Sequence, residues 1–375
     1  MKILVLNAGS SSLKFDLWET TAEMIAADSD LLLQQGEVER VASMAEAIAT
    51  VFAKVKIPIH AVGHRVVHGG DRFTTSVIID AEVEKGIEEL SVLAPLHNPH
   101  NLEAIRAARA HLPDAVQVAV FDTAFHHTLP PPAYAYALPY KYLTEKKIRR
   151  YGFHGISHRY VSWRFAQIHG KVRADYRMIT CHLGNGCSVC AIDRGKSIDT
   201  SMGFTPLEGL VMGSRSGDVD AGAILYLITQ EKLQPADVAN VLNKESGLKG
   251  LSGVSNDMRD VLKKSKAGDV LARLAVDTFC YRAKKYIGAY LAAMNGADAL
   301  IFTGGIGENS PEIRAQICTG LENLGIALEP AANASGSRED RRIGTSPIPV
   351  WVVPTEEELL IARDTLRCIL GIAHE

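Results

Sequence analysis

The alternation of apolar and polar positions along the chain predicts two β-hairpins of the same kind, about half a chain apart. One occupies 178–192 around the turn Gly184-Asn185-Gly186, and Asn-Gly between two β-rich runs is a strong hairpin signal. The other occupies 2–18 and turns at 7–12, which reads Asn-Ala-Gly-Ser-Ser-Ser. Turns of this kind expose backbone N–H groups, which suits a phosphate. The repetition predicts two related halves that face one cleft.

The rest of the chain mixes strand and helix patterns. Short apolar runs predict strands at 61–67, 116–121, 299–302 and 350–353. Helices are predicted at 42–56, 82–92, 102–111, 159–169, 223–242, 268–295 and 359–370. The stretch from residue 20 to the first of these helices is polar and carries no evident chemistry. We place a domain boundary near Arg150, which gives domains of 1–150 and 151–358.

Bulk composition narrows the class of protein. A chain of 375 residues is long enough for two domains, and 47% apolar with 22% charged residues is typical of a globular protein. The formal net charge of -3 offers no basic excess to bind a nucleic acid. We find no run long enough to span a membrane and no leader pattern, so we expect a cytoplasmic protein.

The cysteines form one pattern that resembles a metal or redox motif. There are 6 cysteines, sparse for this length, which suits reduced thiols. Cys187 and Cys190 have Cys-x-x-Cys spacing, with Cys181 and His182 nearby. On a strand, positions three apart point to opposite faces, so the two thiols would diverge. We expect buried structural cysteines rather than a metal or redox site.

Three charged residues are candidates for chemistry on the sequence alone. Arg65 lies inside an apolar strand and must find an anion or a carboxylate. Asp122 directly follows a buried strand, where α/β sheets gather functional residues. Arg215, flanked by glycine and serine on unhindered backbone, could clamp a substrate anion. An edge-strand arginine, a helix-capping aspartate and a solvated loop arginine remain the alternative interpretations.

A glycine-rich turn at 304–309 suggests a nucleotide. It follows the buried strand 299–302 and precedes Ser310-Pro311-Glu312, a typical helix start. Strand, glycine-rich turn and helix N-terminus together favour phosphate or nucleotide binding. The segment is not a P-loop, and it lacks the third glycine of a dinucleotide-binding fingerprint.

Taken together, these segments resemble the acetate kinase family. The matching pieces occur in the family's order and cover nearly the whole chain: 7–14, 63–70, 121–126, 152–158, 182–186, 203–220, 304–309 and 357–359. The resemblance implies an α/β fold of two duplicated ribonuclease-H-like (actin-like ATPase) domains flanking a nucleotide cleft. It also implies a homodimer and a C-terminal helix, about 359–375, that packs back on the first domain.

The reaction that this resemblance implies is reversible phosphoryl transfer from ATP to acetate, giving ADP and acetyl phosphate. Mg²⁺ is the implied metal ion, with Mn²⁺ as an alternative, and Asn7 and Glu357 would lie near it. Arg65 and Arg215 would hold the carboxylate and the moving phosphoryl group. Asp122 matches the family's essential aspartate, either as a base or as an orienting group. The implied catalytic histidines are His154 and His97.

The resemblance also assigns binding residues. Nucleotide contacts fall in the two hairpin turns and in two later segments: Ser10, Ser12, Lys14, His182, Leu183, Gly184, Asn185, Gly186, Asp257, Met258, Arg259, Gly305, Ile306, Gly307, Glu308 and Asn309. An apolar pocket for the acyl methyl group would be lined by Val67, Leu96, Phe153 and Pro206. Such a pocket discriminates one methylene by only about 1–3 kcal/mol.

Two departures and three alternative functions remain open. The segment between residues 18 and 62 is shorter than the family leads us to expect, and Ser214 stands where we expect threonine. A propionate or butyrate kinase of the same fold is the first alternative. A non-catalytic actin-like ATP-binding protein is the second, although it would need no carboxylate clamp such as Arg65 and Arg215. A nicotinamide dehydrogenase is the third, and the missing fingerprint argues against it.

Overall fold

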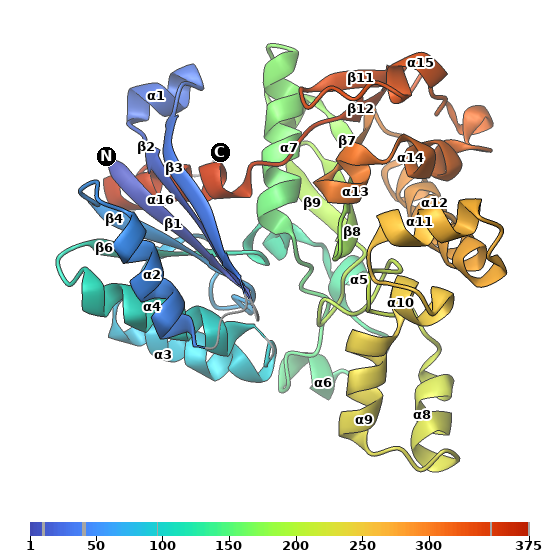
Figure 1. Cartoon of the computed structure of the whole chain (residues 1–375), viewed down its shortest axis with the longest axis horizontal. Coiled ribbons are helices and arrows are strands. Elements are labelled where there is room, and N and C mark those ends of the chain that lie inside the picture. The colour runs from blue at the N-terminus through green and yellow to red at the C-terminus, as the bar shows by residue number, and fades with distance from the viewer. Residues whose placement is uncertain (10–11, 40–42, 96, 346, 374–375) are drawn as a thin grey trace. The chain divides into compact units, whose positions relative to one another are not determined.

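The computed structural model describes residues 1–9, 12–39, 43–95, 97–345 and 347–373 (Figure 1). The chain divides into two compact units. The first consists of Met1–His127, Phe153–Tyr160 and Glu356–Glu375, and the second of Thr128–Gly152 and Val161–Thr355. The domain boundary near Arg150 stays a prediction, because compactness alone does not delimit a duplicated domain.

The first unit is built on a six-stranded mixed sheet with the strand order β3-β2-β1-β4-β6-β5. Its strands are β1 (Lys2–Ala8), β2 (Ser12–Glu19), β3 (Leu31–Glu39), β4 (Ala61–Val66), β5 (Val77–Ile78) and β6 (Val116–Phe121). Strands β1, β2 and β3 pair antiparallel, β1, β4 and β6 pair parallel, and β5 pairs antiparallel with β6. The N-terminal hairpin predicted from the sequence is confirmed.

The second unit repeats this sheet strand for strand. Its order is β9-β8-β7-β10-β12-β11, with β7 (Arg177–Leu183), β8 (Cys187–Asp193), β9 (Lys196–Thr200), β10 (Ala299–Thr303), β11 (Arg341–Gly344) and β12 (Val350–Val352). The parallel and antiparallel pairings fall at the same places as in the first sheet. The predicted internal duplication and the α/β class are therefore confirmed.

The helices divide between the two units as follows. The first unit contains α1 (Ala22–Ala27), α2 (Met44–Lys54), α3 (Ala81–Glu89), α4 (Asn98–His111) and α16 (Glu357–Leu370), and α7 (Gly155–Ile168) begins in it. The second contains α5 (Pro131–Tyr134), α6 (Lys141–Thr144), α8 (Ala221–Thr229), α9 (Pro235–Asn240), α10 (Gly247–Ser252), α11 (Met258–Lys266), α12 (Val270–Met294), α13 (Gly304–Asn309), α14 (Pro311–Cys318) and α15 (Pro330–Asn333).

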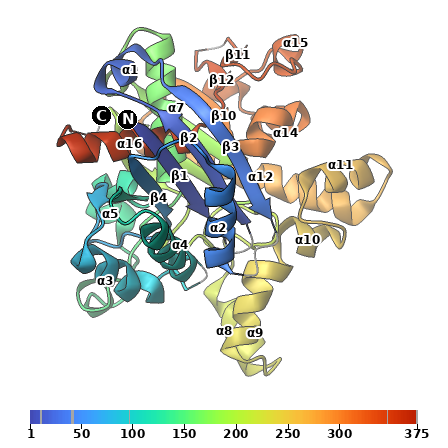
Figure 2. The same cartoon turned by 60° about the vertical axis from the view of Figure 1, so that its left-hand side comes forward.

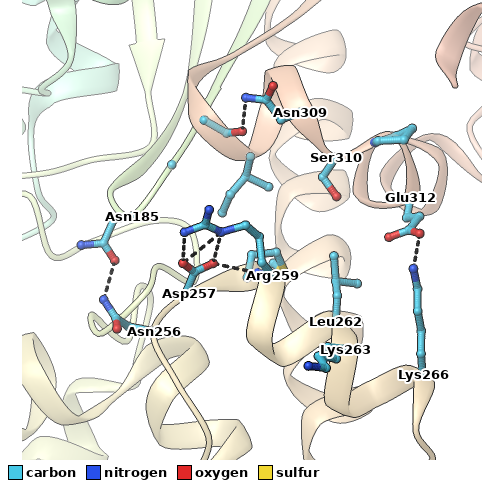
Figure 3. Close-up of a pocket in the computed structure, with 15 residues that line it drawn as sticks. Asn185, Asn256, Asp257, Arg259, Leu262, Lys263, Lys266, Asn309, Ser310 and Glu312 are labelled. Atoms are coloured by element: carbon cyan, nitrogen blue, oxygen red, sulfur yellow. Dashed lines mark hydrogen bonds and ion pairs between the residues drawn. The ribbon is translucent and has the colours of Figure 1, made fainter. Parts of the chain in front are cut away.

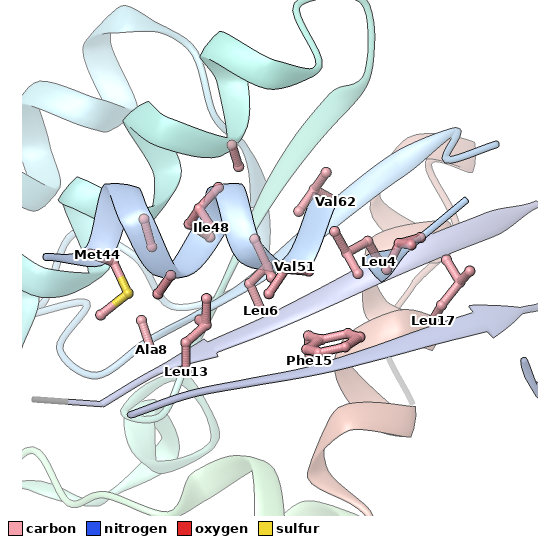
Figure 4. Packing of buried hydrophobic residues seen from close by; sticks show 14 residues of the cluster. Leu4, Leu6, Ala8, Leu13, Phe15, Leu17, Met44, Ile48, Val51 and Val62 are labelled. Carbon is pink, nitrogen blue, oxygen red and sulfur yellow. The ribbon is translucent and has the colours of Figure 1, made fainter. Parts of the chain in front are cut away.

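The apolar residues at every second position of β1 contribute to the hydrophobic core of the first unit. Leu4, Leu6 and Ala8 point to one face of the sheet, since every second residue of a strand does so. On that face they are buried in one cluster with Ile48 and Val51 of α2 (Figure 4).

The opposite face of the first sheet carries helix α16, which packs on β1, β4 and β6 (Figure 2). Gly63 of β4 makes this close packing possible. A Cβ at that position would lie 2.4 Å from Thr365 Oγ1 and 2.8 Å from Ile361 Cγ2. A side chain at residue 63 would therefore push the helix away from the sheet.

Several elements differ from the sequence prediction. Strand β3 was not predicted, because its first residues, Leu-Leu-Leu-Gln-Gln, show no alternation, and as an edge strand it stays largely exposed. The short strand β11 was also missed. The predicted helix 223–242 is interrupted between α8 and α9, and the second of these begins at Pro235, a residue that favours a helix start. The turn predicted at 304–309 is the short helix α13.

The described part of the chain contains no helix that combines the length and the apolar character needed to cross a membrane.

All six cysteines are free thiols, and Cys187 and Cys190 are fully buried, as predicted. Their sulfur atoms have different neighbours: Cys187 Sγ donates to Gly184 O at 3.1 Å, and Cys190 Sγ lies 3.3 Å from Ser197 Oγ. Burial raises the pKa of Cys187 to about 12, which keeps it protonated.

Candidate active site

The carboxyl ends of β1, β4 and β6 bring a polar cluster together in the first unit. Arg65, near the end of β4, donates from Nε to Asp122 Oδ1 at 3.1 Å and from NH2 to Asp122 Oδ2 at 2.5 Å. Its third nitrogen donates to Asn7 Oδ1 at 3.1 Å. This placement follows from topology, because parallel strands end at the same edge of a sheet.

Two glutamates from the start of α16 complete this cluster. Glu358 Oε1 accepts from Asn7 Nδ2 at 3.1 Å, and Glu357 Oε2 lies 3.9 Å from Arg65 Nε. Both glutamates belong to the first unit although they lie near the end of the sequence. Of them, sequence reasoning named Glu357 and not Glu358. A second acidic residue at the same helix start was the available signal.

The cluster holds more negative than positive charge. Burial, with Asp122 and Glu358 nearby, raises the pKa of Glu357 to about 7, against the opposing effect of Arg65. Burial and Glu358 likewise raise the pKa of Asp16 to about 6. Burial alone would lower the pKa of Arg65, but the carboxylates of Asp122 and Glu357 outweigh it and raise that pKa. Such a surplus of carboxylates favours a bound cation.

The donor atoms suit a hard divalent metal ion. Asn7 and the glutamates offer amide and carboxylate oxygens, the ligands that Mg²⁺ prefers. Within the described residues, no group of three or more His, Cys, Asp or Glu side chains forms a ready-made metal site. Mg²⁺ is usually bound by only one or two carboxylates, with water and substrate phosphates completing its shell.

The predicted acyl-pocket residues of the first unit lie just beyond β4 and before α7. Val67 and Phe153 are both buried, and the His68 ring packs edge-on against Phe153 with centroids 5.4 Å apart. Leu96 and Ser10 lie outside the described residues. The fourth predicted residue, Pro206, belongs to the second unit.

The remaining predicted residues of the first unit lie at the ends of elements. His154 has a φ of 55°, a left-handed conformation that non-glycine residues adopt rarely and often at functional sites. The residue after it donates from Gly155 N to Asp122 O at 2.9 Å, which ties this segment to the Asp122 backbone. His97 occupies the N-cap of α4. Ser12 begins β2, and Lys14 lies on β2 opposite Asn7.

A cavity of about 910 Å³ in the second unit is the candidate nucleotide pocket (Figure 3). The turn of the second hairpin, the first turns of α11 and the α13–α14 region line it. The lining residues are Gly184, Asn185, Asn256, Asp257, Met258, Arg259, Leu262, Lys263, Lys266, Gly305, Ile306, Asn309, Ser310, Pro311 and Glu312. Figure 3 shows Arg259 held by Asp257, with Nε donating to Asp257 Oδ1 at 3.0 Å.

Several nucleotide residues named from the sequence do not line this cavity: His182, Leu183, Gly186, Gly307 and Glu308. Glu308 instead holds its own loop, because its Oε1 accepts from Gly304 N at 2.8 Å and from Thr355 N at 3.2 Å. Gly307 O accepts from Arg314 NH1 at 2.8 Å.

Other lining residues were missed by sequence reasoning, and a sequence signal existed for most of them. Lys263 and Lys266 lie four and seven residues after Arg259 on α11, a spacing that places them on one helix face. Ser310, Pro311 and Glu312 were identified only as a helix start.

Arg215 lies on a tied loop of the second unit rather than on unhindered backbone as expected. Gly209 N donates to Asp218 Oδ1 at 2.8 Å, and Asp218 N donates to Gly209 O at 3.0 Å, which closes the loop that carries the arginine. From this loop, Arg215 NH1 donates to the oxygen of Pro206, which precedes the loop, at 3.2 Å. The predicted anion clamp is thus oriented by the predicted acyl-pocket proline.

A polar network that the sequence did not reveal holds residues 200–209. Arg150 NH1 donates to three successive carbonyl oxygens, those of Thr200, Ser201 and Met202, at 2.9, 3.1 and 3.0 Å. Its NH2 donates to Glu208 Oε1 at 2.6 Å. The Tyr136 hydroxyl donates to the other Glu208 oxygen and accepts from Phe204 N at 2.9 Å. The loop around Pro206 is therefore anchored at both ends.

Comparison with known proteins agrees with this geometry. Residues 2–363 match the Acetokinase family. The chain is 50% identical to "Acetate kinase" of Solibacter usitatus, over 100% of both chains. Its fold matches the crystal structure of Porphyromonas gingivalis acetate kinase with a TM-score of 0.90 and 43% identity, covering 98% of this chain and 99% of that one. A propionate kinase from Francisella tularensis also matches with a TM-score of 0.90, at 40% identity over 99% and 100% of the two chains. These full-length matches show that the chain is a kinase that belongs to the acetokinase family.

Proposed function

We propose that this chain catalyses reversible transfer of the γ-phosphoryl group of ATP to acetate, giving ADP and acetyl phosphate. Family membership implies ATP or ADP as a substrate together with a divalent metal ion, and we propose that the ion is Mg²⁺, with Mn²⁺ as a substitute. The observation that carries the proposal is the Arg65 guanidinium. It is fixed by both oxygens of buried Asp122 at the carboxyl ends of β4 and β6.

The chemistry needs positioned cations more than it needs a base. An acetate oxygen attacks the γ-phosphorus, the bond to the β–γ bridging oxygen breaks, and the electron pair leaves with ADP. A carboxylic acid of this kind has a pKa of about 4 to 5 and is already ionised at neutral pH, so no proton must be removed. Phosphoryl transfer then depends on alignment and charge neutralisation.

Asp122 is best assigned an orienting role. Both of its carboxylate oxygens accept hydrogen bonds from Arg65, so neither faces a substrate proton in this arrangement. A bidentate pair fixes the plane of the guanidinium, and the plane determines which way Arg65 presents its remaining donors. We assign Arg215 as the second cation, oriented by Pro206 O, and His154, His97 and His182 as further polar contacts to the transferring group.

The metal ion and the nucleotide use separate sets of residues. We assign Asn7 and Glu357 to the metal ion, directly or through water, with Glu358 beside them. When bound, the ion neutralises charge on the phosphate oxygens. We assign the adenosine to the cavity of the second unit, where Met258 and Ile306 offer apolar surface beside Arg259.

The acyl preference is a matter of degree. Val67 and Phe153 line the proposed methyl pocket, and such a pocket separates acetate from propionate by about 1–3 kcal/mol at most. The similarity to a propionate kinase makes propionate the competing substrate to measure.

We propose that the protein is a homodimer and that a second copy covers an apolar face of the second unit. Helix α12 exposes four large apolar side chains, by 49–77%, at a spacing that places them on one side of the helix: Val270, Leu271, Leu274 and Tyr281. A surface of this kind usually marks an interface. Leu271→Asp should shift the chain toward monomer by light scattering, whereas Val92→Asp, on a more exposed site of the first unit, should not. Free thiols suit a reducing compartment, and we propose the cytoplasm.

Acyl phosphate trapping by hydroxylamine tests the proposal. Purified protein receives Mg-ATP with acetate, propionate or butyrate, beside Arg215→Ala and the surface control Arg72→Ala, whose arginine forms ion pairs with Glu82 and Glu89. We expect the strongest hydroxamate signal with acetate, a loss of at least a hundredfold in Arg215→Ala, and little change in Arg72→Ala. No signal with any acid, despite ATP binding, would refute the proposed function.

A further inference from the structure

Four consecutive backbone N–H groups after β4 are all bonded to side chains rather than to the sheet. Residues 67–70, which we call the acyl-wall segment, continue beyond the end of the strand. Their donors and acceptors are Val67 N to Asn101 Oδ1 (3.1 Å), His68 N to Asn98 Oδ1 (3.1 Å), Gly69 N to Thr123 Oγ1 (3.0 Å) and Gly70 N to His68 Nδ1 (3.0 Å). Side-chain acceptors therefore take the role that the backbone of a neighbouring strand would play for this segment.

Two of these acceptors come from the first turn of α4. Asn98 and Asn101 are 0% and 2% exposed, and residues three apart share one side of a helix. A buried amide needs partners for both its oxygen and its nitrogen. His68 satisfies both groups of the Asn98 amide, because Asn98 Nδ2 also donates to His68 O at 3.0 Å.

Asn101 connects two different parts of the site. Its oxygen accepts from Val67 N, and its Nδ2 donates to Ala8 O at 3.0 Å, at the end of β1. Ala8 follows Asn7, which contacts Arg65 and Glu358. One buried amide thus spans the gap between the backbone of the acyl wall and the backbone that carries a proposed metal contact.

We propose that Asn101 is a positioning residue that fixes how far Val67 stands from the end of β1, and that this spacing sets the acyl length the enzyme accepts. The inference rests on the proposed function, in which Val67 lines the methyl pocket. Val67 is bonded through its N–H, so its side chain follows the amide. Asn98 supports the same wall one residue later, through His68 and its contact with Phe153.

Displacement of the wall should change acid recognition more than nucleotide recognition. The described nucleotide cavity belongs to the second unit and contains no residue bonded to Asn101. Small displacements near reacting groups can have large kinetic effects, and a wall that moves outward admits one more methylene.

Asn101→Asp tests the link with little change in shape. The carboxylate can still accept from Val67 N, but it cannot donate to Ala8 O and would repel that oxygen. We expect the KM for acetate to rise at least tenfold, the KM for ATP to stay within twofold, and the acetate-to-propionate ratio of kcat/KM to fall at least fivefold. Asn101→Ser, which keeps a short hydroxyl, should lie between the parent and Asn101→Asp, and it decides the matter if Asn101→Asp does not fold.

A control separates positioning from general loss of stability. Ser43→Ala removes the N-cap bond from Glu46 N to Ser43 Oγ on α2, a helix that packs on α4. We expect Ser43→Ala to lower the thermal midpoint and leave the acyl ratio unchanged. An acyl ratio within twofold of the parent in the folded Asn101 variants would overturn the inference. Inactivity of the parent itself with every acid would instead refute the proposed function.

Discussion

Replacing Gly203 with alanine should break the network of Arg150, Glu208 and Tyr136 that anchors residues 200–209. A Cβ on Gly203 would lie 1.7 Å from Glu208 Oε2 and 2.2 Å from Tyr136 Oη. Neither oxygen can remain where it is, so the Glu208 carboxylate must turn away. It then loses its bonds to the Tyr136 hydroxyl and to Arg150 NH2. The backbone itself adds no strain, because Gly203 is not among the residues with positive φ.

The size of the effect follows from these two bonds. Hydrogen bonds to a charged group contribute about 1.5–3 kcal/mol each to folding, which gives an upper bound of about 3–6 kcal/mol. Two facts reduce it: Glu208 is 32% exposed and can reach water when displaced, and Arg150 keeps its three carbonyl acceptors. With solvent screening taken into account, we expect a loss of about 2–3 kcal/mol in the free energy of unfolding.

Urea unfolding followed by tryptophan fluorescence measures this loss, and hydroxamate formation at varied acetate measures its consequence. We expect the KM for acetate to rise, because the loop carries Pro206, whose carbonyl orients Arg215. Gly288→Ala is the matched control: the added methyl meets nothing within 4 Å, and alanine should stabilise helix α12 by about 0.5–1 kcal/mol. If Gly203→Ala unfolds within about 0.5 kcal/mol of the parent, the network does not anchor the loop.

Three further predictions concern the rest of the molecule. Gly63→Ala should destabilise the protein by about 1–3 kcal/mol, because the methyl meets Thr365 of α16. Thr365→Ala should restore part of that loss in thermal unfolding, and an unchanged midpoint for Gly63→Ala alone would contradict the packing. Burial lowers the pKa of His64 to about 4, so its neutral form supports stability above its ordinary pKa of about 6.5. This contribution of about 3 kcal/mol is lost as pH falls from 6.5 to 4. His64→Gln should weaken the acid dependence of the thermal midpoint, and an equal fall in both proteins would refute this. In native protein, Ellman's reagent should label Cys368 alone and slowly, since the other five cysteines are buried; two or more fast thiols would argue against this burial.

The sequence predicted those elements whose conformation depends on a few neighbouring residues. Both hairpins and the strand that carries Arg65 could be identified because alternation and Asn-Gly act over a few residues. The meeting of Arg65 with Asp122 followed from one more step, since parallel strands end at a common edge. Edge strand β3 could not be identified, because an exposed strand needs no apolar alternation.

The supporting residues could not be predicted, because their partners are distant in sequence. Asn101 bonds to residues 34 and 93 positions away, and Arg150 bonds to residues 50 to 58 positions away. An asparagine on a helix and an arginine before a glycine-rich segment look alike whether they face solvent or a buried carbonyl. Only the fold decides which carbonyls they meet.

Helix α16 constrains the order in which the first unit can assemble during translation. The sheet of the first unit is made from the first 121 residues, yet the helix that covers one of its faces begins at Glu357 and ends at Leu370. During translation, one apolar face of the N-terminal sheet therefore stays uncovered until α16 has been synthesised. A chain that stops before residue 357 would lack α16, and the sheet of its first unit would keep that face exposed. We expect such truncated chains to depend on chaperones and to aggregate through that bare sheet.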